Sequence, residues 1–350
     1  KAITKDVDPK QIAAISFSGQ MMGCVCVDQH GNPIRDAIIW ADQRAVEETD
    51  AIRAKIDDDR FYQITGHRLS PNYSVEKLMW VRSHEPENFK QVHKVLNAKD
   101  YIIYKLTGKF LTEFSDASGT HLLDLLAWDW SPEILKAAEI DEELLPELVA
   151  STHIAGGVTK AASEVTGLAQ GTPVVMGGGD GLCAGVGASC VQEGMAYNYV
   201  GSSSWISLCT KEPVFDTQQR TFNWPHIVPG MYSPCGTMQS AGASYSWLQR
   251  EIAKFETETA AAEDGNPYER INALVAESPV GANGLIFLPY LLGERTPWWN
   301  SDARGAYVGL KLEHNRADVF RATLEGITMN LGLICDVFKA YAQLKEMVVI

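Results

Sequence analysis

The chain has 350 residues, of which 45% are hydrophobic and 21% are charged, so it can bury an ordinary globular core. At about 150 residues per domain, this length favours two domains. The net charge of -14 at neutral pH argues against nucleic acid or an anionic membrane surface as the main partner. No apolar run reaches the ~20 residues that a membrane-spanning helix needs.

The first part of the chain predicts short strands followed by helices, from runs of apolar residues between turn residues. The expected strands cover residues 12–17, 24–28 and 38–40. The expected helices cover residues 44–56, 75–82, 97–106 and 132–138. Pro132 follows Ser131, which suits an N-cap with proline at the first helical position.

The second part repeats this order of strands and then helices. Its expected strands cover residues 195–200, 205–209, 285–288 and 346–350, and its expected helices cover residues 244–255 and 316–341. A strand at 173–176 is expected near the end of the first part. The change near residue 190 predicts an α/β protein with one domain over 1–190 and a second over 191–350. Both domains are expected to be incomplete, because the chain begins in a helix-like segment and ends on an apolar strand.

The seven cysteines indicate a reducing compartment. Their number is odd, most of their neighbours are apolar, and no signal peptide is evident. Cys24 and Cys26 stand too close together for a zinc pair, and on a strand both would point into the core. We therefore predict free thiols and a cytoplasmic location.

The segment TPVVMGGGDGLCAGVGASC, residues 172–190, runs from a strand through a glycine turn into a small-residue helix. Residues 179–184 fit G-x-G-x-x-A, but Asp180 would then lie against a pyrophosphate, and no acidic residue follows about 20 positions on. A second interpretation is a turn that Asp180 caps through its own backbone. In the third, Asp180 is a general base that takes a proton from a hydroxyl group attacking a phosphoryl group.

Two further turns carry polar groups that could serve a ligand. Gly201–Ser204 offers backbone N–H groups and hydroxyls to phosphate oxygens, although such a hairpin is usually only a turn. In Ser18–Gly23, two glycines bracket Gln20, Met21 and Met22. This second segment is either a bulged turn with methionine in the core or the wall of a small-molecule pocket.

Together these segments resemble the FGGY family of carbohydrate kinases, in its xylulokinase-like branch. The matching blocks occur in the same order as in the family, over nearly the whole chain. They are SGQMMG (18–23), WADQR (40–44), NYSVEKLMW (72–80), SDASGT (115–120), GGD (178–180), YLLGERTP (290–297), GAYVGL (305–310) and RATLEG (321–326).

The resemblance implies an actin-like ATPase fold of two ribonuclease-H-like domains with a central cleft. It also implies ATP, Mg²⁺ and transfer of the γ-phosphate to a sugar hydroxyl, with no metal ligand assigned in this chain. It makes Asp180 the general base. The residues implied for the sugar are Gln20, Met21, Met22, Asn72 and Gly181, and those implied for the nucleotide are Gly201, Ser202 and Gly242.

Two positions depart from the pattern of D-xylulokinases. Met22 stands where they usually have histidine, and Gly181 stands where they usually have asparagine. Each change removes a hydrogen-bonding side chain worth ~1–3 kcal/mol of discrimination. We expect D-xylulose, converted to xylulose 5-phosphate, as the first substrate to consider, and another ketose or a polyol as nearly equal candidates.

The family's first strand, with D-x-G-T, and its glycine-rich adenine turn are missing from the sequence. We expect that the sequence omits these parts, and an inactive sugar-binding or regulatory module is the alternative. A nicotinamide-dependent dehydrogenase is a third hypothesis, from the glycine match alone. The expected partners are a sugar or polyol and ATP, and a homodimer is left open.

Overall fold

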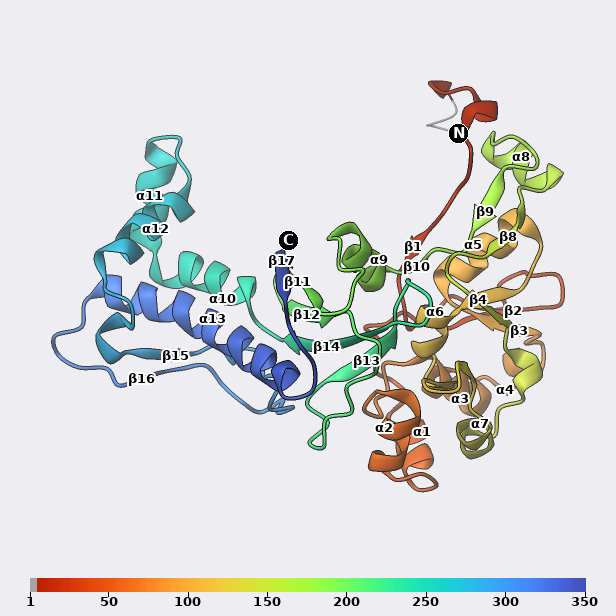
Figure 1. Ribbon diagram of the computed structural model, residues 1–350, viewed down its shortest axis with the longest axis horizontal. Coiled ribbons are helices and arrows are strands. Elements are labelled where there is room, and N and C mark those ends of the chain that lie inside the picture. Colours follow the sequence, from red (N-terminus) through yellow and green to blue (C-terminus); the bar gives the residue numbers. More distant parts are fainter. Residues whose placement is uncertain (1–4) are drawn as a thin grey trace. The chain divides into compact units, whose positions relative to one another are not determined.

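The computed structural model describes residues 5–350, and the chain forms two compact units whose elements are labelled in Figure 1. The first unit extends to Val191 and includes Cys209–Phe215 and Phe222–Ser233. The second unit comprises Gln192–Leu208, Asp216–Thr221 and Pro234–Ile350. The division into domains 1–190 and 191–350 stays a prediction.

The first unit combines short strands with helices. Its strands are β1 (Ser18–Gly19), β2 (Val25–Val27), β3 (Lys94–Leu96), β4 (Leu111–Glu113), β5 (Leu123–Asp124), β6 (Asp129–Trp130), β7 (Glu147–Val149), β8 (Ile154–Gly157), β9 (Pro173–Val175), β10 (Gly178–Gly179) and β13 (Phe222–Pro225). Its helices are α1 (Val46–Arg53), α2 (Asp58–Thr65), α3 (Ser74–His84), α4 (Pro86–Phe89), α5 (Ala98–Thr107), α6 (Phe114–Ser118), α7 (Pro132–Ala138), α8 (Lys160–Thr166) and α9 (Asp180–Gly187), with 3₁₀ turns at Pro9–Gln11 and Glu142–Leu144.

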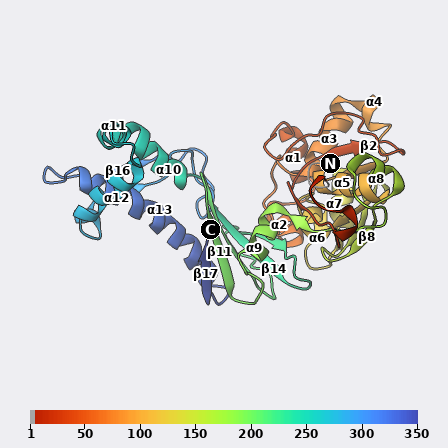
Figure 2. The same cartoon turned by 90° about the horizontal axis from the view of Figure 1, so that it is seen from above.

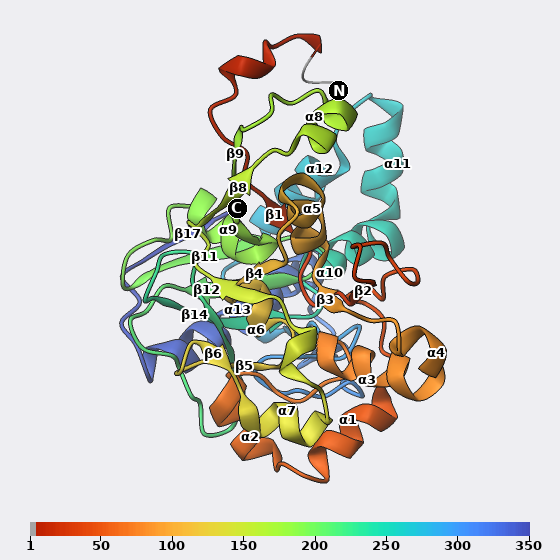
Figure 3. The same cartoon turned by 90° about the vertical axis from the view of Figure 1, so that its right-hand side faces the viewer.

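Two apolar clusters hold the first unit together. The larger cluster joins side chains of α1, α2, α3 and α7, such as Ile52, Phe61, Leu78 and Ile134, all at most 1% exposed. The second joins α5 to β4, β8 and β9. Figure 3 shows α5 beside β1, and α5 also contacts β4 and β9. This packing places α5 directly behind the strand that carries the SGQ segment.

The second unit contains longer elements. Its strands are β11 (Met195–Val200), β12 (Ser204–Leu208), β14 (Tyr232–Met238), β15 (Ile286–Leu288), β16 (Ala306–Val308) and β17 (Glu346–Val349). Its helices are α10 (Gly242–Trp247), a π turn (Leu248–Ile252), α11 (Lys254–Ala262), α12 (Pro267–Glu277) and α13 (Arg316–Lys339), with a 3₁₀ turn at Ala282–Gly284.

A sheet and the long helix α13 organise the second unit. The strands β14, β12, β11 and β17 lie side by side in that order, and β17 runs parallel to β11. Ile327, Ile334 and Phe338 of α13 pack against Ile206 and Leu208 of the sheet, at the spacing of one helix face. Helices α11 and α12 lie together beside α13 (Figure 2).

Most of the predicted elements are present, and three predictions need correction. Residues 12–17 form only a single bridge, from Ile15 to Val174 of β9. The continuous pairing of this segment, with β10, begins only at Ser18. Residues 38–40 contribute one bridge at Ile38. The predicted helix 244–255 is interrupted, since Ala253 has φ -92° and ψ 38°, outside the helical region.

Local signals explain the predictions that hold. Ser131 caps α7 by accepting a hydrogen bond from the backbone N–H of Ile134, as its sequence indicated. Cys24 and Cys26 are each 1% exposed, and their sulfur atoms lie 3.8 Å apart, as expected for alternate residues pointing into a core. Within the described residues, no helix is long and apolar enough to cross a membrane.

Candidate active site

The register of β1 and β10 brings two of the sequence motifs together. Ser18 pairs with Gly178 and Gly19 pairs with Gly179 in parallel. Gln20 and Asp180 therefore follow directly after paired residues, at the same edge of this small sheet. The two motifs are about 160 residues apart in the sequence, and the strand pairing makes them neighbours.

The glycines of residues 177–179 allow a close approach of neighbouring chain segments. Gly177 has φ +67°, and a Cβ there would lie 2.0 Å from the carbonyl oxygen of Phe17. A Cβ on Gly179 would lie 2.4 Å from the sulfur of Met21. The glycine run is thus required for packing against β1 and Met21, which is a different role from cradling a phosphate.

Asp180 is the first residue of α9 and is exposed. Its Oδ1 accepts a hydrogen bond of 2.9 Å from the N–H of Gly181, so the self-capping turn is present. Although the carboxyl group is accessible, the protein around it removes part of its hydration and raises the pKa of Asp180 above the ordinary value of 3.8. A raised pKa makes the carboxylate a stronger proton acceptor, as a general base requires.

The other residues predicted for the sugar belong to the same unit. Gln20 and Gly181 are half-buried, and Met21 is 7% exposed under Gly179. Met22 has φ +59°, an uncommon backbone conformation for a residue with a side chain. The Asn72 side chain donates to the carbonyl of Trp40 at 3.1 Å, so its amide is already engaged within the protein.

Lys77 connects Met22 with Asn72, and sequence analysis assigned it no role. Its ammonium group donates to the carbonyl oxygens of Met22 and Ile39, each at 2.8 Å, and to that of Asn72. The residue is 0% exposed, and this burial lowers the pKa of Lys77 to about 8. A lysine directly before the apolar run Leu78–Trp80 in the K-L-x-W block was the signal that could have revealed it.

The three residues predicted for the nucleotide lie together in the second unit. The N–H of Gly242 donates to the carbonyl of Gly201 at 2.9 Å, and the N–H of Ala243 donates to that of Ser202 at 3.0 Å. A Cβ on Gly242 would lie 2.4 Å from the Gly201 carbonyl oxygen. The hairpin turn between β11 and β12 is therefore held against the start of α10 by bonds that only glycine at 242 permits.

Glu294 of the GERTP block supports the same region and was also missed. Its Oε1 accepts hydrogen bonds from the N–H groups of Gln239 at 2.7 Å and Arg295 at 2.8 Å. Its Oε2 accepts a hydrogen bond of 2.9 Å from the Asn330 side chain on α13. Glu294 therefore orients the chain that leads from β14 into Gly242.

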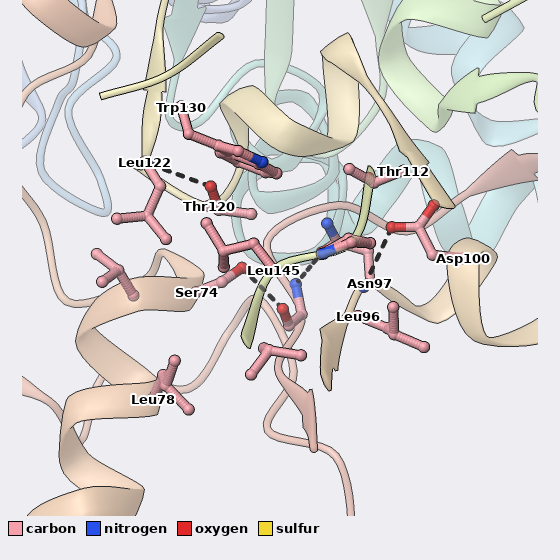
Figure 4. A pocket seen from close by; sticks show the side chains of 14 residues that line it. Ser74, Leu78, Leu96, Asn97, Asp100, Thr112, Thr120, Leu122, Trp130 and Leu145 are labelled. Carbon is pink, nitrogen blue, oxygen red and sulfur yellow. Dashed lines mark hydrogen bonds between the residues drawn. The ribbon is translucent and has the colours of Figure 1, made fainter. Parts of the chain in front are cut away.

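A small cavity lies within the first unit, and none of the residues predicted for the sugar or the nucleotide lines it. Ser74, Asn97, Asp100 and Thr120 line it together with apolar side chains (Figure 4). Its volume is about 10 Å³, which is room for about one water molecule. This cavity is too small for a sugar, and its hydrogen bonds belong to the support of Gly23, whose N–H donates to Asn97 Oδ1 at 3.0 Å.

The described residues contain no group of three or more His, Cys, Asp or Glu side chains arranged to hold a metal. Phosphoryl-transfer enzymes usually hold Mg²⁺ by one or two carboxylates together with substrate phosphates. Of the residues predicted for this site, Asp180 alone carries such a group. Among the residues predicted for this site, Asp180 is therefore the one that could contribute a carboxylate to Mg²⁺ held by substrate phosphates.

Comparison with known proteins identifies the family. The model of the N-terminal domain of the FGGY family of carbohydrate kinases matches residues 1–187, and that of its C-terminal domain matches residues 196–350. The chain belongs to the FGGY family. The dehydrogenase hypothesis is therefore wrong, because the glycine turn belongs to a kinase family and not to a dinucleotide-binding fold.

Two curated relatives and one solved structure show how close the likeness is. The chain is 34% identical to a xylulose kinase of Staphylococcus xylosus, over 97% of this chain and 68% of that protein. It is 31% identical to a gluconokinase of Bacillus subtilis (strain 168), over 94% of this chain and 64% of that protein. The structure of a ligand-bound xylulose kinase from Lactobacillus acidophilus matches with a TM-score of 0.89 and 28% identity, over 99% of this chain and 69% of that one.

These matches confirm the predicted fold class. The chain has the FGGY kinase fold, an actin-like ATPase fold of two domains. It spans about two thirds of the length of the relatives it matches, with 68% of the Staphylococcus xylosus protein covered.

We expect Gly242→Ala to weaken nucleotide binding, because the added methyl group would force the Gly201 turn away from α10. The Michaelis constant for ATP should rise by about tenfold or more, a loss of ~1.4 kcal/mol of binding. Titration of ATP at saturating sugar measures this. Gly332→Ala, in α13, is the matched control, because a Cβ there meets nothing within 4 Å. Equal Michaelis constants for Gly242→Ala and wild type would contradict the prediction.

Proposed function

We propose that the protein transfers the γ-phosphoryl group of ATP to a hydroxyl group of a ketose or polyol, with D-xylulose as the first candidate. Family membership supports the reaction class, and the similarity to a xylulose kinase supports the sugar. The gluconokinase relative, at 31% identity, keeps the choice of sugar open. The observation that carries the proposal is an accessible Asp180 with a raised pKa, beside Gln20 at the end of β10.

In the proposed mechanism, Asp180 accepts the proton of the sugar hydroxyl, and the oxygen of that hydroxyl forms a bond to the γ-phosphorus. The bond from that phosphorus to the β–γ bridging oxygen breaks, and ADP leaves. Gly201 and Ser202 present the turn that faces the phosphates, and Gly242 holds this turn in place. Mg²⁺ bound to the ATP phosphates would supply charge neutralisation.

Met22 and Gly181 bear on the choice of sugar in this proposal. Neither residue has a side chain that can donate a hydrogen bond to a hydroxyl group. A site without such a donor discriminates less, by ~1–3 kcal/mol, against a substrate that lacks the corresponding group. The proposal therefore includes acceptors related to D-xylulose, and the cytoplasmic location and the homodimer stay predictions beside it.

The test incubates the natural full-length protein with ATP, Mg²⁺ and each of a panel of acceptors in turn, and measures the rate of ADP release. The panel comprises D-xylulose, L-xylulose, ribulose, fructose, gluconate, glycerol, erythritol and xylitol. We expect one acceptor to exceed the others by about tenfold or more in kcat/KM. Folded protein that binds one of these compounds without turnover would favour a sugar-binding module and overturn the proposal.

A further inference from the structure

A buried carboxylate, that of Glu113, lies beneath the glycine turn that ends in Asp180. Glu113 is the last residue of β4 and is 0% exposed. Its Oε1 accepts hydrogen bonds from the Ser115 hydroxyl at 2.6 Å and the Asp116 N–H at 2.9 Å. Its Oε2 accepts from the Ser115 N–H at 3.0 Å and the Ser151 hydroxyl at 2.7 Å. Four donors thus converge on one side chain.

The two serines extend these bonds to the turn. The Ser115 hydroxyl accepts a hydrogen bond of 2.9 Å from the N–H of Gly179. The backbone carbonyl of Ser151 accepts one of 3.0 Å from the N–H of Gly177. Residues on both sides of Gly178 are therefore attached to serines that Glu113 holds. Because the Ser115 oxygen accepts from Gly179, its own proton is free to point to Glu113, which must act as an acceptor.

Lys99 links the same cluster to the partner strand. Its side chain is 0% exposed and lies 3.8 Å from Glu113, 2.9 Å from Asp100 and 3.2 Å from Asp116. Burial disfavours its charge, but the three carboxylates together raise the pKa of Lys99 above the usual value. A Cβ on Gly19 would lie 2.5 Å from the Lys99 Cβ, so β1 rests directly on this side chain.

We infer that Glu113 is a positioning residue for Asp180, acting through Ser115 and Ser151. This inference rests on the proposed function, in which Asp180 must reach an acceptor hydroxyl. Asp180 directly follows Gly179 in the sequence. The hydrogen bond from the Gly179 N–H to Ser115 therefore fixes the position of the backbone from which the Asp180 carboxylate extends. A misplacement of about 1 Å at a reacting group can cost about 10²-fold in rate.

The experiment compares Glu113→Gln and Ser115→Ala with wild type in the full-length protein. Glu113→Gln replaces one acceptor oxygen by a donor. Depending on which oxygen is replaced, the bonds from the Ser115 hydroxyl and Asp116 N–H or those from the Ser115 N–H and Ser151 hydroxyl are lost. We expect kcat to fall by about tenfold or more in Glu113→Gln, with the Michaelis constant for ATP changed by less than about twofold. Ser115→Ala should lower kcat in the same way, and the double variant should lose less than the product of the two effects.

Asp116→Asn is the matched control. Asp116 belongs to the same buried cluster, and its carboxylate pairs with Lys99 at 3.2 Å. The hydrogen bonds from the Gly177 and Gly179 amides go to Ser151 and Ser115 instead. Its kcat should stay within about twofold of wild type, because the two serines that hold the turn are bonded to Glu113 and not to the Asp116 carboxylate. A purely structural role for Glu113 would lower the melting temperature of Glu113→Gln and leave kcat of the folded fraction unchanged.

Amide hydrogen exchange separates failure of this inference from failure of the proposed function. The Gly179 and Gly177 amides should exchange faster in Glu113→Gln and no faster in Asp116→Asn. Wild-type protein without kinase activity would overturn the proposed function, and the exchange rates would still test the link from Glu113 to the turn. Wild-type kcat in folded Glu113→Gln, or in Ser115→Ala if the first variant does not fold, would overturn the inference.

Discussion

Asp180→Asn is expected to lower kcat by about 10²–10⁴-fold, because the amide cannot take the proton of the attacking hydroxyl. Asparagine is nearly isosteric, and its side-chain oxygen can still accept from the Gly181 N–H, a bond of 2.9 Å in wild type. The turn and α9 should therefore keep their conformation. Steady-state kinetics of ADP release with the best acceptor measures the loss, and retained turnover would refute the assignment of Asp180 as base.

The same substitution should not destabilise the protein at neutral pH. Burial raises the pKa of Asp180 above 3.8, so the folded state holds the proton more tightly than the unfolded state. Stability therefore falls as pH rises from 3.8 through the folded-state pKa, and the ionised carboxylate carries this cost at pH 7. Asp180→Asn lacks it and should be as stable as wild type or more stable at pH 7, with the difference shrinking toward pH 3.8. Denaturant unfolding at several pH values measures both points.

Asp57→Asn is the control for loss of a carboxylate. Asp57 caps α2 by accepting from the N–H of Arg60 at 2.9 Å, and asparagine caps helices equally well. Its kcat should equal that of wild type.

In wild type, kcat should fall on acidification as Asp180 becomes protonated, with a midpoint above 3.8. A kcat that shows no acid limb down to pH 3.8 would contradict this role.

Lys77→Met is expected to cost several kcal/mol of stability. The carbonyl oxygens of Met22 and Asn72 would lose their ammonium donor inside the protein, whereas that of Ile39 keeps a hydrogen bond from the N–H of Asp42. Each unsatisfied buried group costs ~1–3 kcal/mol, and a whole domain is stable by only about 5–15 kcal/mol. Methionine matches the length of the lysine stem, so the loss reports the ammonium group rather than a cavity. Urea unfolding measures the change.

Compared with wild type, folded Lys77→Met should bind the sugar more weakly and ATP about equally well. The reason is that Met22 and Asn72 lose the ammonium group that holds both of them. The Michaelis constant for the sugar should rise by about tenfold, with that for ATP nearly unchanged. Lys90→Met is the control, because Lys90 pairs with Glu87 on the surface with 68% of its side chain exposed. Equal unfolding midpoints for Lys77→Met and Lys90→Met would show that the three carbonyl bonds contribute nothing.

The pH dependence of stability offers an independent check on Lys77. Burial lowers its pKa to about 8 from 10.5, so between these values the unfolded state binds the proton that the folded state has released. The contribution of Lys77 to stability therefore rises with pH between about 8 and 10.5. Lys77→Met should lack this rise.

Local sequence alone determined many of the elements. Ser131 and Pro132 specified the start of α7, and the alternating pattern on either side of Gly201–Ser204 specified the β11–β12 hairpin, because capping and turn geometry depend on neighbouring residues. The predicted strand at 12–17 and helix at 244–255 differ from the structure. A strand needs a partner elsewhere in the chain, and the break at Ala253 lies where no glycine or proline signals it.

The ordered motifs of the sequence likewise determined the family and the identity of the proposed base. What only the tertiary structure decided is which groups hold that base and the sugar residues in place. Lys77 reaches Met22 across 55 residues of sequence, and Gly179 reaches Ser115 across 64. Such bonds leave no local pattern, because their partners meet only when α3 and α6 pack against the turns that follow β1 and β10.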